Sequence, residues 1–461
     1  MKTTSTPAPT TPAPHPWRWP ALTALLLAEA MNLLDATIVQ VAAPAVHAGL
    51  GGSVSDVQWF STAYTLPFAV LLITGGRLGD IAGRRRLFVL GVTLFTAASV
   101  ACALAPTAGL LIAFRAVQGA AAAVIIPQTI GLIKAMFEGD ELSRALGSIG
   151  PVMGLAAVCG PVLGGVLTHA DLFGSSWRAA FLVNVPVALV VLALSPKLLE
   201  NRAPHRPALD GPGTALAATG TGLLVYPLIG TNLTELPPHD WALLALGLLA
   251  LAAFALHQRR TTTPLLEPGL FTHRGFLPAL ATSTTFFAVT NGLLTVVVLQ
   301  LQLQAGQGVL AAGLSLTPWS VGLAVSSWLS GRRGARRRMM PYGLALVLLG
   351  LTAAAAVYAT TATVTATATA PAPYPWPLLP ALALVGLGAG LFTPAFFTLA
   401  LRPLRPQEVG SAAGALNAVQ QLGATLGVAV LGSAYLDGSA VAACAVAVAL
   451  TLLCWAASRR M

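Results

Sequence analysis

The sequence predicts an all-α integral membrane protein with about 14 transmembrane helices. Two observations support this fold class. The 461 residues are 56% hydrophobic and only 9% charged, whereas a soluble domain carries about 25% charged residues. The apolar residues are also gathered into long runs, and a helix that crosses a bilayer needs about 20 such residues. Lipid is therefore the expected solvent for most of the chain.

Short breaks rich in charge, proline or glycine separate the apolar runs, and we expect each run to be one span. The first run contains Glu29, Asn32 and Asp35. It is too long for the core of a signal peptide, so we expect a retained span that follows a disordered cytoplasmic tail at residues 1–16. The expected spans are 22–45, 57–78, 87–105, 110–134, 143–167, 179–195, 213–230, 241–257, 276–301, 309–330, 341–360, 377–401, 411–434 and 439–457.

Positive charge gives the orientation. With the N-terminus in the cytoplasm, the inner segments hold nearly all the arginines and lysines, from the Arg84–Arg86 cluster to Arg459 and Arg460, and the outer loops hold only Arg178. Cytoplasmic loops are enriched in this way. We therefore expect a multi-pass protein of the cell membrane with both termini cytoplasmic. Because the net charge of +10 lies in short loops, membrane lipids are the expected partners and nucleic acid is not.

A weak internal repeat divides the chain. The second span contains Pro67 and ends in GRLGDIAGRRR, and the tenth contains Pro318 and ends in SGRRGARRR. Parallel repeats of this kind build one large class of transporters. We expect two six-helix bundles, at residues 17–197 and 261–461, joined by a linker at 198–260 that holds two extra transmembrane helices.

Three formal charges fall inside the expected spans: Glu29, Asp35 and Arg115. Each costs about 2.5–3.5 kcal/mol on insertion scales, so such residues normally face a cavity or a partner. One interpretation is a proton pathway, because burial disfavours the charged form of a carboxyl group. The other is a structural ion pair between Asp35 and Arg115, with Glu29 simply protonated near the cytoplasmic end.

Two glycine-rich segments suggest sites of conformational change. In the loop after span two, the candidates for a conformational latch are Gly76, Gly79, Asp80, Gly83, Arg84 and Arg85. In span five, the candidates for a gate are Gly160, Pro161, Gly164 and Gly165. Glycines allow helices to approach closely, and proline kinks a helix. The alternatives are an ordinary positive-inside loop and plain helix packing.

Taken together, these segments resemble the major facilitator superfamily, and more narrowly its drug:proton antiporter branch with fourteen spans. The motifs that carry the resemblance are LDATIVQVAAP from Leu34, GRLGDIAGRRRL from Gly76, RAVQGAAAA from Arg115, CGPVLGG from Cys159 and WRAAFLVNVP from Trp177. The resemblance implies alternating access between two bundles and proton coupling at Asp35 and Arg115. Glu29 and Gln420 depart from the family's pattern.

The expected function is proton-coupled export of small amphipathic or toxic compounds, with a proton-coupled importer of a metabolite as the alternative. We expect a functional monomer that needs no cofactor or metal and is not an enzyme, because the chain has no cluster of histidine, cysteine and carboxylate residues. Polar and aromatic residues at mid-span are expected to line the substrate cavity: Asn32, Gln128, Asn291, Gln300, Trp319, Phe396 and Asn417.

Overall fold

The computed structural model describes residues 16–53, 55–138, 141–142, 144–145, 148–171, 174–200, 208–229, 236–262, 264–333, 338–367 and 374–461, and within these ranges the regular structure is helical. Among the described residues, thirteen helices are long and apolar enough to span a membrane. In lipid a helix satisfies every backbone polar group internally, so long apolar runs fold this way. The expected fold class is confirmed.

The thirteen helices coincide with thirteen of the fourteen expected spans, and the exception is 213–230. That segment forms α9 (Gly211–Val225) and a 3-10 turn (Tyr226–Leu228), and it is absent from the thirteen. Four glycines and a proline lower its apolar content within residues 211–222. The expected tail at residues 1–16 lies outside the described residues except for Pro16.

The first group of helices packs around α1 and α4. It comprises α1 (Arg18–Leu50), α2 (Asp56–Ala82), α3 (Arg84–Ala103), α4 (Ala108–Met136), α6 (Ile149–Ala170), α7 (Ala179–Leu182) and α8 (Asn184–Leu194). Helix α4 packs on α2 and α3, while α1 packs on α6 and α8. We call this group the N-terminal bundle.

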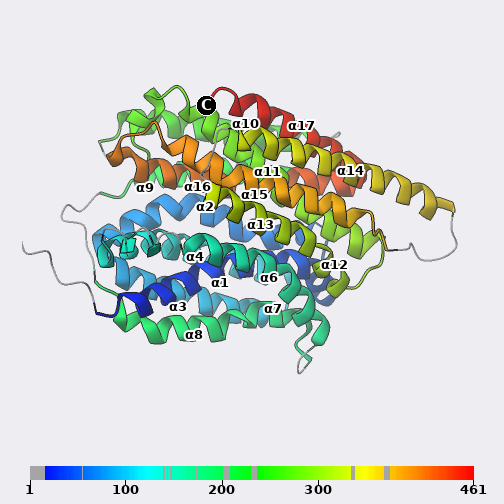
Figure 1. Cartoon of the computed structure of the whole chain (residues 1–461), viewed down its shortest axis with the longest axis horizontal. Helices are drawn as coiled ribbons and strands as arrows, with labels where there is room; N and C mark the ends of the chain where they lie inside the picture. The colour runs from blue at the N-terminus through cyan, green and yellow to red at the C-terminus, as the bar shows by residue number, and fades with distance from the viewer. Residues whose placement is uncertain are drawn as a thin grey trace, which may run out of the picture.

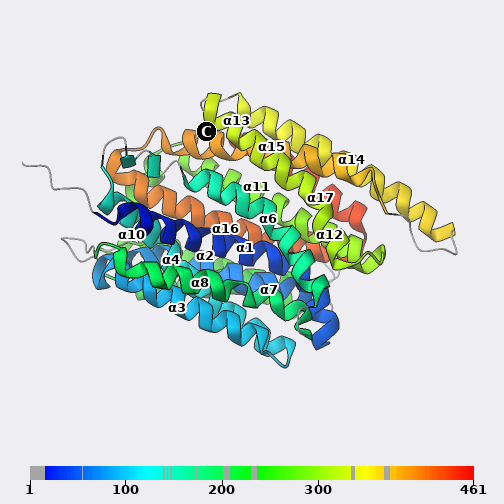
Figure 2. The ribbon, with the colours of Figure 1, turned by 60° about the horizontal axis from the view of Figure 1, so that its bottom comes forward.

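The second group packs around α11, α15 and α16. It comprises α11 (Phe276–Leu299), α12 (Val309–Ser315), α13 (Thr317–Arg333), α14 (Met339–Thr367), α15 (Leu378–Leu401), α16 (Pro406–Asp437) and α17 (Ala440–Ser458). A π-helical turn at Gln300–Gln304 extends α11. We call this group the C-terminal bundle. In Figures 1 and 2, α3 and α8 lie at one side of the molecule and α14 lies at the opposite side.

The two bundles meet along a seam formed by α2 with α16 and by α6 with α12 and α13. Figure 2 shows α6, α1 and α16 in the middle of the molecule. Hydrogen bonds cross the seam between the hydroxyls of Thr65 and Thr425, 2.6 Å apart, and from Ser320 to the Ala157 carbonyl at 3.0 Å. The expected boundaries between the two halves and the linker remain predictions.

In the inserted pair, a buried carboxylate at the start of α9 holds α9 and α10 (Pro238–Arg260) together. Asp210 is 4% exposed and accepts hydrogen bonds from the Gly213 amide at 2.8 Å and Gln258 at 2.6 Å. Its Oδ1 lies 2.7 Å from Nε2 of His257. Burial acts to raise the pKa of Asp210, but the bonds to His257, Gly213 and Gln258 outweigh burial and leave that pKa lowered.

Candidate functional site

A buried polar network lies at the centre of the N-terminal bundle. Nη1 of Arg115 on α4 lies 2.5 Å from Oδ2 of Asp35 on α1, and the two side chains are 1% and 0% exposed. Arg115 also donates from Nε to the Phe60 carbonyl on α2 at 2.9 Å. The ring of Tyr64 lies 4.3 Å from the guanidinium carbon. The structural ion pair considered from the sequence is therefore present, and Arg115 has partners on both α1 and α2.

Two amides complete the site around Asp35. Oδ1 of Asp35 accepts from Gln118 on α4 at 2.8 Å and from Asn184 on α8 at 2.7 Å. Both amides also donate to the hydroxyl of Ser99 on α3, at 2.8 and 3.2 Å. Asp35 thus accepts three hydrogen bonds, and helices α1, α2, α3, α4 and α8 each contribute to the network.

This arrangement couples the charge of Asp35 to helix packing. Its three partners are all donors, and a protonated carboxyl group has an O–H donor of its own and fewer acceptor sites. Protonation would therefore displace at least one partner and leave Arg115 without its counter-charge. Because buried charges need a partner, the gain or loss of one proton here changes the forces between several helices.

Sequence reasoning did not assign a role to Gln118, Ser99 or Asn184. Gln118 lies within the RAVQG segment three residues after Arg115, and Asn184 lies within WRAAFLVNVP. A polar side chain in an otherwise apolar span was the available signal. It did not suffice, because the partners are far apart in the sequence: Asn184 binds Asp35 across 149 residues.

Glu29 is 8% exposed and lies six residues before Asp35 on α1. Thr129 of α4 is its polar neighbour. Asn32, midway between the two carboxylates, accepts a hydrogen bond from the hydroxyl of Tyr64. Since Tyr64 also faces Arg115, the Glu29 end of α1 is linked to the Asp35 site through Asn32 and Tyr64.

The residues expected to line a substrate cavity fall into different environments. Gln128 lies between α4 and α2, where it donates to the Gly75 carbonyl at 2.8 Å. Phe396 is fully buried and stacks on Phe392, with 5.6 Å between ring centroids. Trp319 is 4% exposed in the same apolar cluster as these rings. Asn291 donates to the Phe287 carbonyl of its own helix, and Gln300 and Asn417 are half-buried. A shared cavity remains a prediction.

The expected latch residues lie where α2 ends and α3 begins. Asp80 pairs with Arg84 at 2.5 Å, and Arg84 also points toward the Pro127 carbonyl of α4 at 3.5 Å. Gly83 has φ +104°, a conformation that favours glycine. A side chain at Gly79 would overlap Gln128. Gly76 faces Pro127, and Arg85 begins α3 beside Arg84. Together these residues connect α2, α3 and α4.

The expected gate residues lie at two close helix contacts. On one side of α6, a side chain at Gly160 would overlap Thr37, and a Cβ at Gly164 would lie 3.0 Å from the Ile38 carbonyl, both on α1. On the other side, a Cβ at Gly165 would lie 3.0 Å from Cα of Leu310 on α12. A side chain at Gly313 of α12 would overlap the carbonyl of Pro161. Helix α6 therefore joins the first span of the N-terminal bundle to the C-terminal bundle.

Helices that cross a membrane, a charged network at mid-span and a glycine-rich seam between two bundles define a polytopic membrane transporter. The model of the Major Facilitator Superfamily matches residues 25–428. The chain belongs to this family, and the family resemblance expected from the motifs is confirmed.

Relatives include named exporters and resistance proteins. The chain is 42% identical to the "Probable actinorhodin transporter" of Streptomyces coelicolor, covering 92% of this chain and 73% of the relative. It is 37% identical to a puromycin resistance protein of Streptomyces alboniger, covering 91% and 82%. It is 32% identical to the multidrug resistance protein Stp of Mycobacterium tuberculosis, covering 87% and 73%.

Solved structures share the fold. A peptide transporter in complex with sulfate aligns with a TM-score of 0.67 and 15% identity over 96% of this chain and 95% of that chain. A D-xylose-proton symporter aligns with a TM-score of 0.64 and 13% identity over 95% and 97%. At these identities the likeness concerns the fold alone.

Proposed function

We propose that this protein exports small amphipathic or toxic compounds across the cell membrane in exchange for protons. The observation that carries the coupling proposal is the buried network in which Asp35 binds Arg115, Gln118 and Asn184. The names of the relatives, which refer to actinorhodin, puromycin and multidrug resistance, support a toxic small molecule as the substrate.

The proposed cycle alternates between two states of Asp35. In the ionised state, the carboxylate holds α1 against α4 and α8 through its three bonds. A proton that arrives from the outer side neutralises Asp35 and weakens the attraction to Arg115. Tyr64 and the Phe60 carbonyl still hold the guanidinium, so Arg115 keeps partners on α2 while α1 is free to shift.

The shift of α1 would reach the seam through α6. Gly160 and Gly164 of α6 pack directly on Thr37 and Ile38, which lie two and three residues after Asp35. Gly165 and Pro161 of the same helix touch α12. One helix, α6, thus lies between α1, where the proton would bind at Asp35, and α12, where the bundles would open. Export follows if the substrate binds the inward-facing state more tightly than the outward-facing state.

Glu29 is proposed to select substrates rather than to drive transport. It lies on the same helix as Asp35 but outside its hydrogen-bond network, and its carboxyl group could attract a cationic substrate. The proposed orientation has both termini in the cytoplasm, and the proposed functional unit is a monomer surrounded by membrane lipids.

The test uses an efflux-deficient bacterial strain and a panel of toxic compounds. Cells that express the chain should tolerate at least one compound better and accumulate less of it, and an ionophore that collapses the proton gradient should abolish the difference. Equal accumulation in expressing and control cells with an energised membrane would contradict export. Uptake by proteoliposomes under an inwardly directed proton gradient would instead support an importer.

A further inference from the structure

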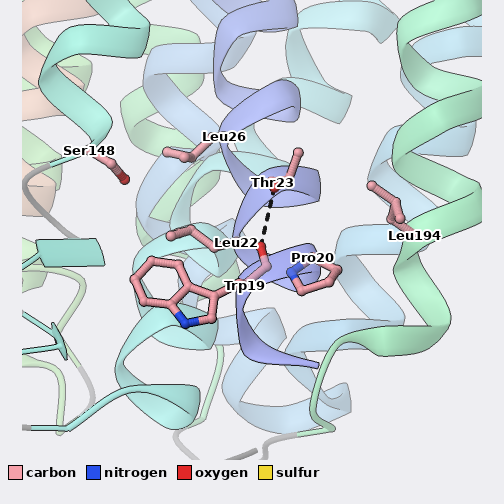
Figure 3. A pocket seen from close by; sticks show the side chains of 7 residues that line it. All are labelled: Trp19, Pro20, Leu22, Thr23, Leu26, Ser148 and Leu194. Atoms are coloured by element: carbon pink, nitrogen blue, oxygen red, sulfur yellow. Dashed lines mark hydrogen bonds between the residues drawn. The ribbon is translucent and has the colours of Figure 1, made fainter. Parts of the chain in front are cut away.

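A groove lies at the N-terminal end of α1, outside the network described above. Figure 3 shows Trp19, Leu22, Thr23 and Leu26 along α1, between Ser148 on one side and Leu194 on the other. The groove has a volume of about 500 Å³, within the roughly 300–1,000 Å³ that is usual for small-molecule sites. Its walls are mostly apolar.

The residues that line the groove lie on or next to α1, α6 and α8 of the N-terminal bundle. Its second wall is α8, which packs mainly on α1 and α3 and lies at the side of the molecule opposite α14 (Figure 1). With the proposed orientation, the N-terminal end of α1 lies at the cytoplasmic surface of the membrane. Trp17 and Trp19 are 53% and 44% exposed there, and tryptophan is enriched at the level of lipid headgroups.

Lys197 places a positive charge near the rim of the groove. The ammonium of Lys197, three residues after Leu194, lies 4.7 Å from the ring centroid of Trp17. Within the described part of the chain, no salt bridge holds Lys197. Arg18 is bound by Glu141 at 2.8 and 3.1 Å, and Arg144 is exposed nearby in the sequence. Lys197 is therefore the cation that a ligand at this rim would meet.

Three described carboxylates outside α1 lie near residues of the groove in the sequence, and two of them are paired, Glu141 with Arg18 and Glu200 with Arg86. Glu138 is exposed at the end of α4, next to Phe137, whose ring packs edge-on against Trp19 at 5.2 Å. Among the described residues outside α1 that lie near the groove in the sequence and form no salt bridge, Lys197 and Arg144 outnumber Glu138. The ligand that fits is an amphipathic anion, with an apolar part against Leu22, Leu26 and Leu194 and an acidic group at Lys197.

We propose that this groove binds an anionic phospholipid of the inner leaflet. An acyl chain would lie along α1 between α6 and α8, and the headgroup phosphate would lie at Lys197 beside Trp17. Basic residues near the membrane surface attract anionic headgroups in this way. Such a lipid would stabilise the start of α1, the helix that carries Glu29 and Asp35. The proposal depends on the proposed orientation and not on the direction of transport.

The experiment measures lipid retention on the purified full-length chain by native mass spectrometry. Phosphatidylglycerol and phosphatidylcholine with identical acyl chains are added in equal amounts. We expect preferential retention of phosphatidylglycerol, and we expect Lys197→Gln to reduce that preference about fivefold, the effect of roughly one basic residue at a membrane surface. Arg402→Gln is the matched control, because Arg402 is an exposed charge at the end of α15.

Variants that place a larger side chain in the groove test whether its apolar walls bind the acyl chain. Thr23→Trp should displace both lipids, and Leu26→Phe provides a milder change if the first variant fails to fold. Equal retention of the two lipids by the unaltered chain would refute the proposal. An equal loss of lipid preference in Arg402→Gln would also refute it, because the preference would then come from general surface charge. Full lipid retention by a folded groove-filling variant would refute it as well.

Discussion

Substitution of Gly313 by alanine tests whether α6 and α12 form a closed gate. In the structure, a Cβ at Gly313 would overlap the Pro161 carbonyl and lie 3.3 Å from Cα of Gly165. Both neighbours are backbone, so no side-chain rotation relieves the overlap. Overpacking of this kind typically costs about 1–3 kcal/mol. The overlap exists only while α6 and α12 are in contact, so it raises the free energy of the closed state alone. The equilibrium between the closed and open states should therefore shift toward the open state by roughly 5- to 150-fold.

Spin labels at His169, near the end of α6, and Gln304, at the end of the π-helical turn, would report the width of the seam. Both positions are exposed and belong to different bundles. Electron-electron distance measurements should show a larger long-distance population in Gly313→Ala. Gly222→Ala is the matched control, because a Cβ there meets nothing within 4 Å. An unchanged distribution in Gly313→Ala, or an equal change in both variants, would refute the gate.

The remaining predictions concern the latch and the inserted helices. Asp80→Asn should slow turnover, because the Asp80–Arg84 pair connects the end of α2 to the start of α3. Thermal stability and substrate binding should change little, since a partly exposed pair of this kind contributes only about 0.2–1 kcal/mol; an unchanged turnover rate would leave the loop as a topological signal. The lowered pKa of Asp210 means that its stabilising contribution is present above the usual aspartate range and lost as the pH falls through the lowered pKa. The melting temperature of Asp210→Asn should therefore be below that of the unaltered chain at neutral pH and converge with it in acid, and a pH-independent difference would contradict this.

The sequence predicted the fold well because the bilayer imposes a simple length rule. Thirteen expected spans matched membrane-length helices, since charged breaks such as Arg84–Arg86 end one span and begin the next. Residues 213–230 were the exception, because glycines at positions 213, 220 and 222 interrupt the apolar pattern on which the rule depends.

The candidate site was predicted only in part. Asp35 and Arg115 stood out because a charge in lipid is costly, and their pairing is confirmed by the 2.5 Å contact. The neutral members of the network did not stand out, because an amide or hydroxyl costs much less and is common in membrane helices. The amide of Gln128 binds the Gly75 carbonyl, a long-range contact that no local pattern encodes, and the expected place of Gln128 in a cavity stays a prediction.

The proposed transport cycle depends most on whether Asp35 carries the coupled proton. Purified chain in proteoliposomes, with an imposed proton gradient and a substrate identified from the toxicity panel, would be compared with Asp35→Asn and with Glu29→Gln. We expect Asp35→Asn to keep substrate binding and downhill movement but to lose uphill transport, and Glu29→Gln to keep uphill transport of at least some compounds.

Because Asp35 and Arg115 are paired in the structure, Asp35→Asn removes the counter-charge of a buried arginine, which typically costs about 3–5 kcal/mol. The folding and stability of the variant are therefore measured first. The decisive measurement is uphill transport by folded Asp35→Asn under the imposed gradient. We expect none, and uphill transport at the rate of the unaltered chain would show that Asp35 does not carry the coupled proton.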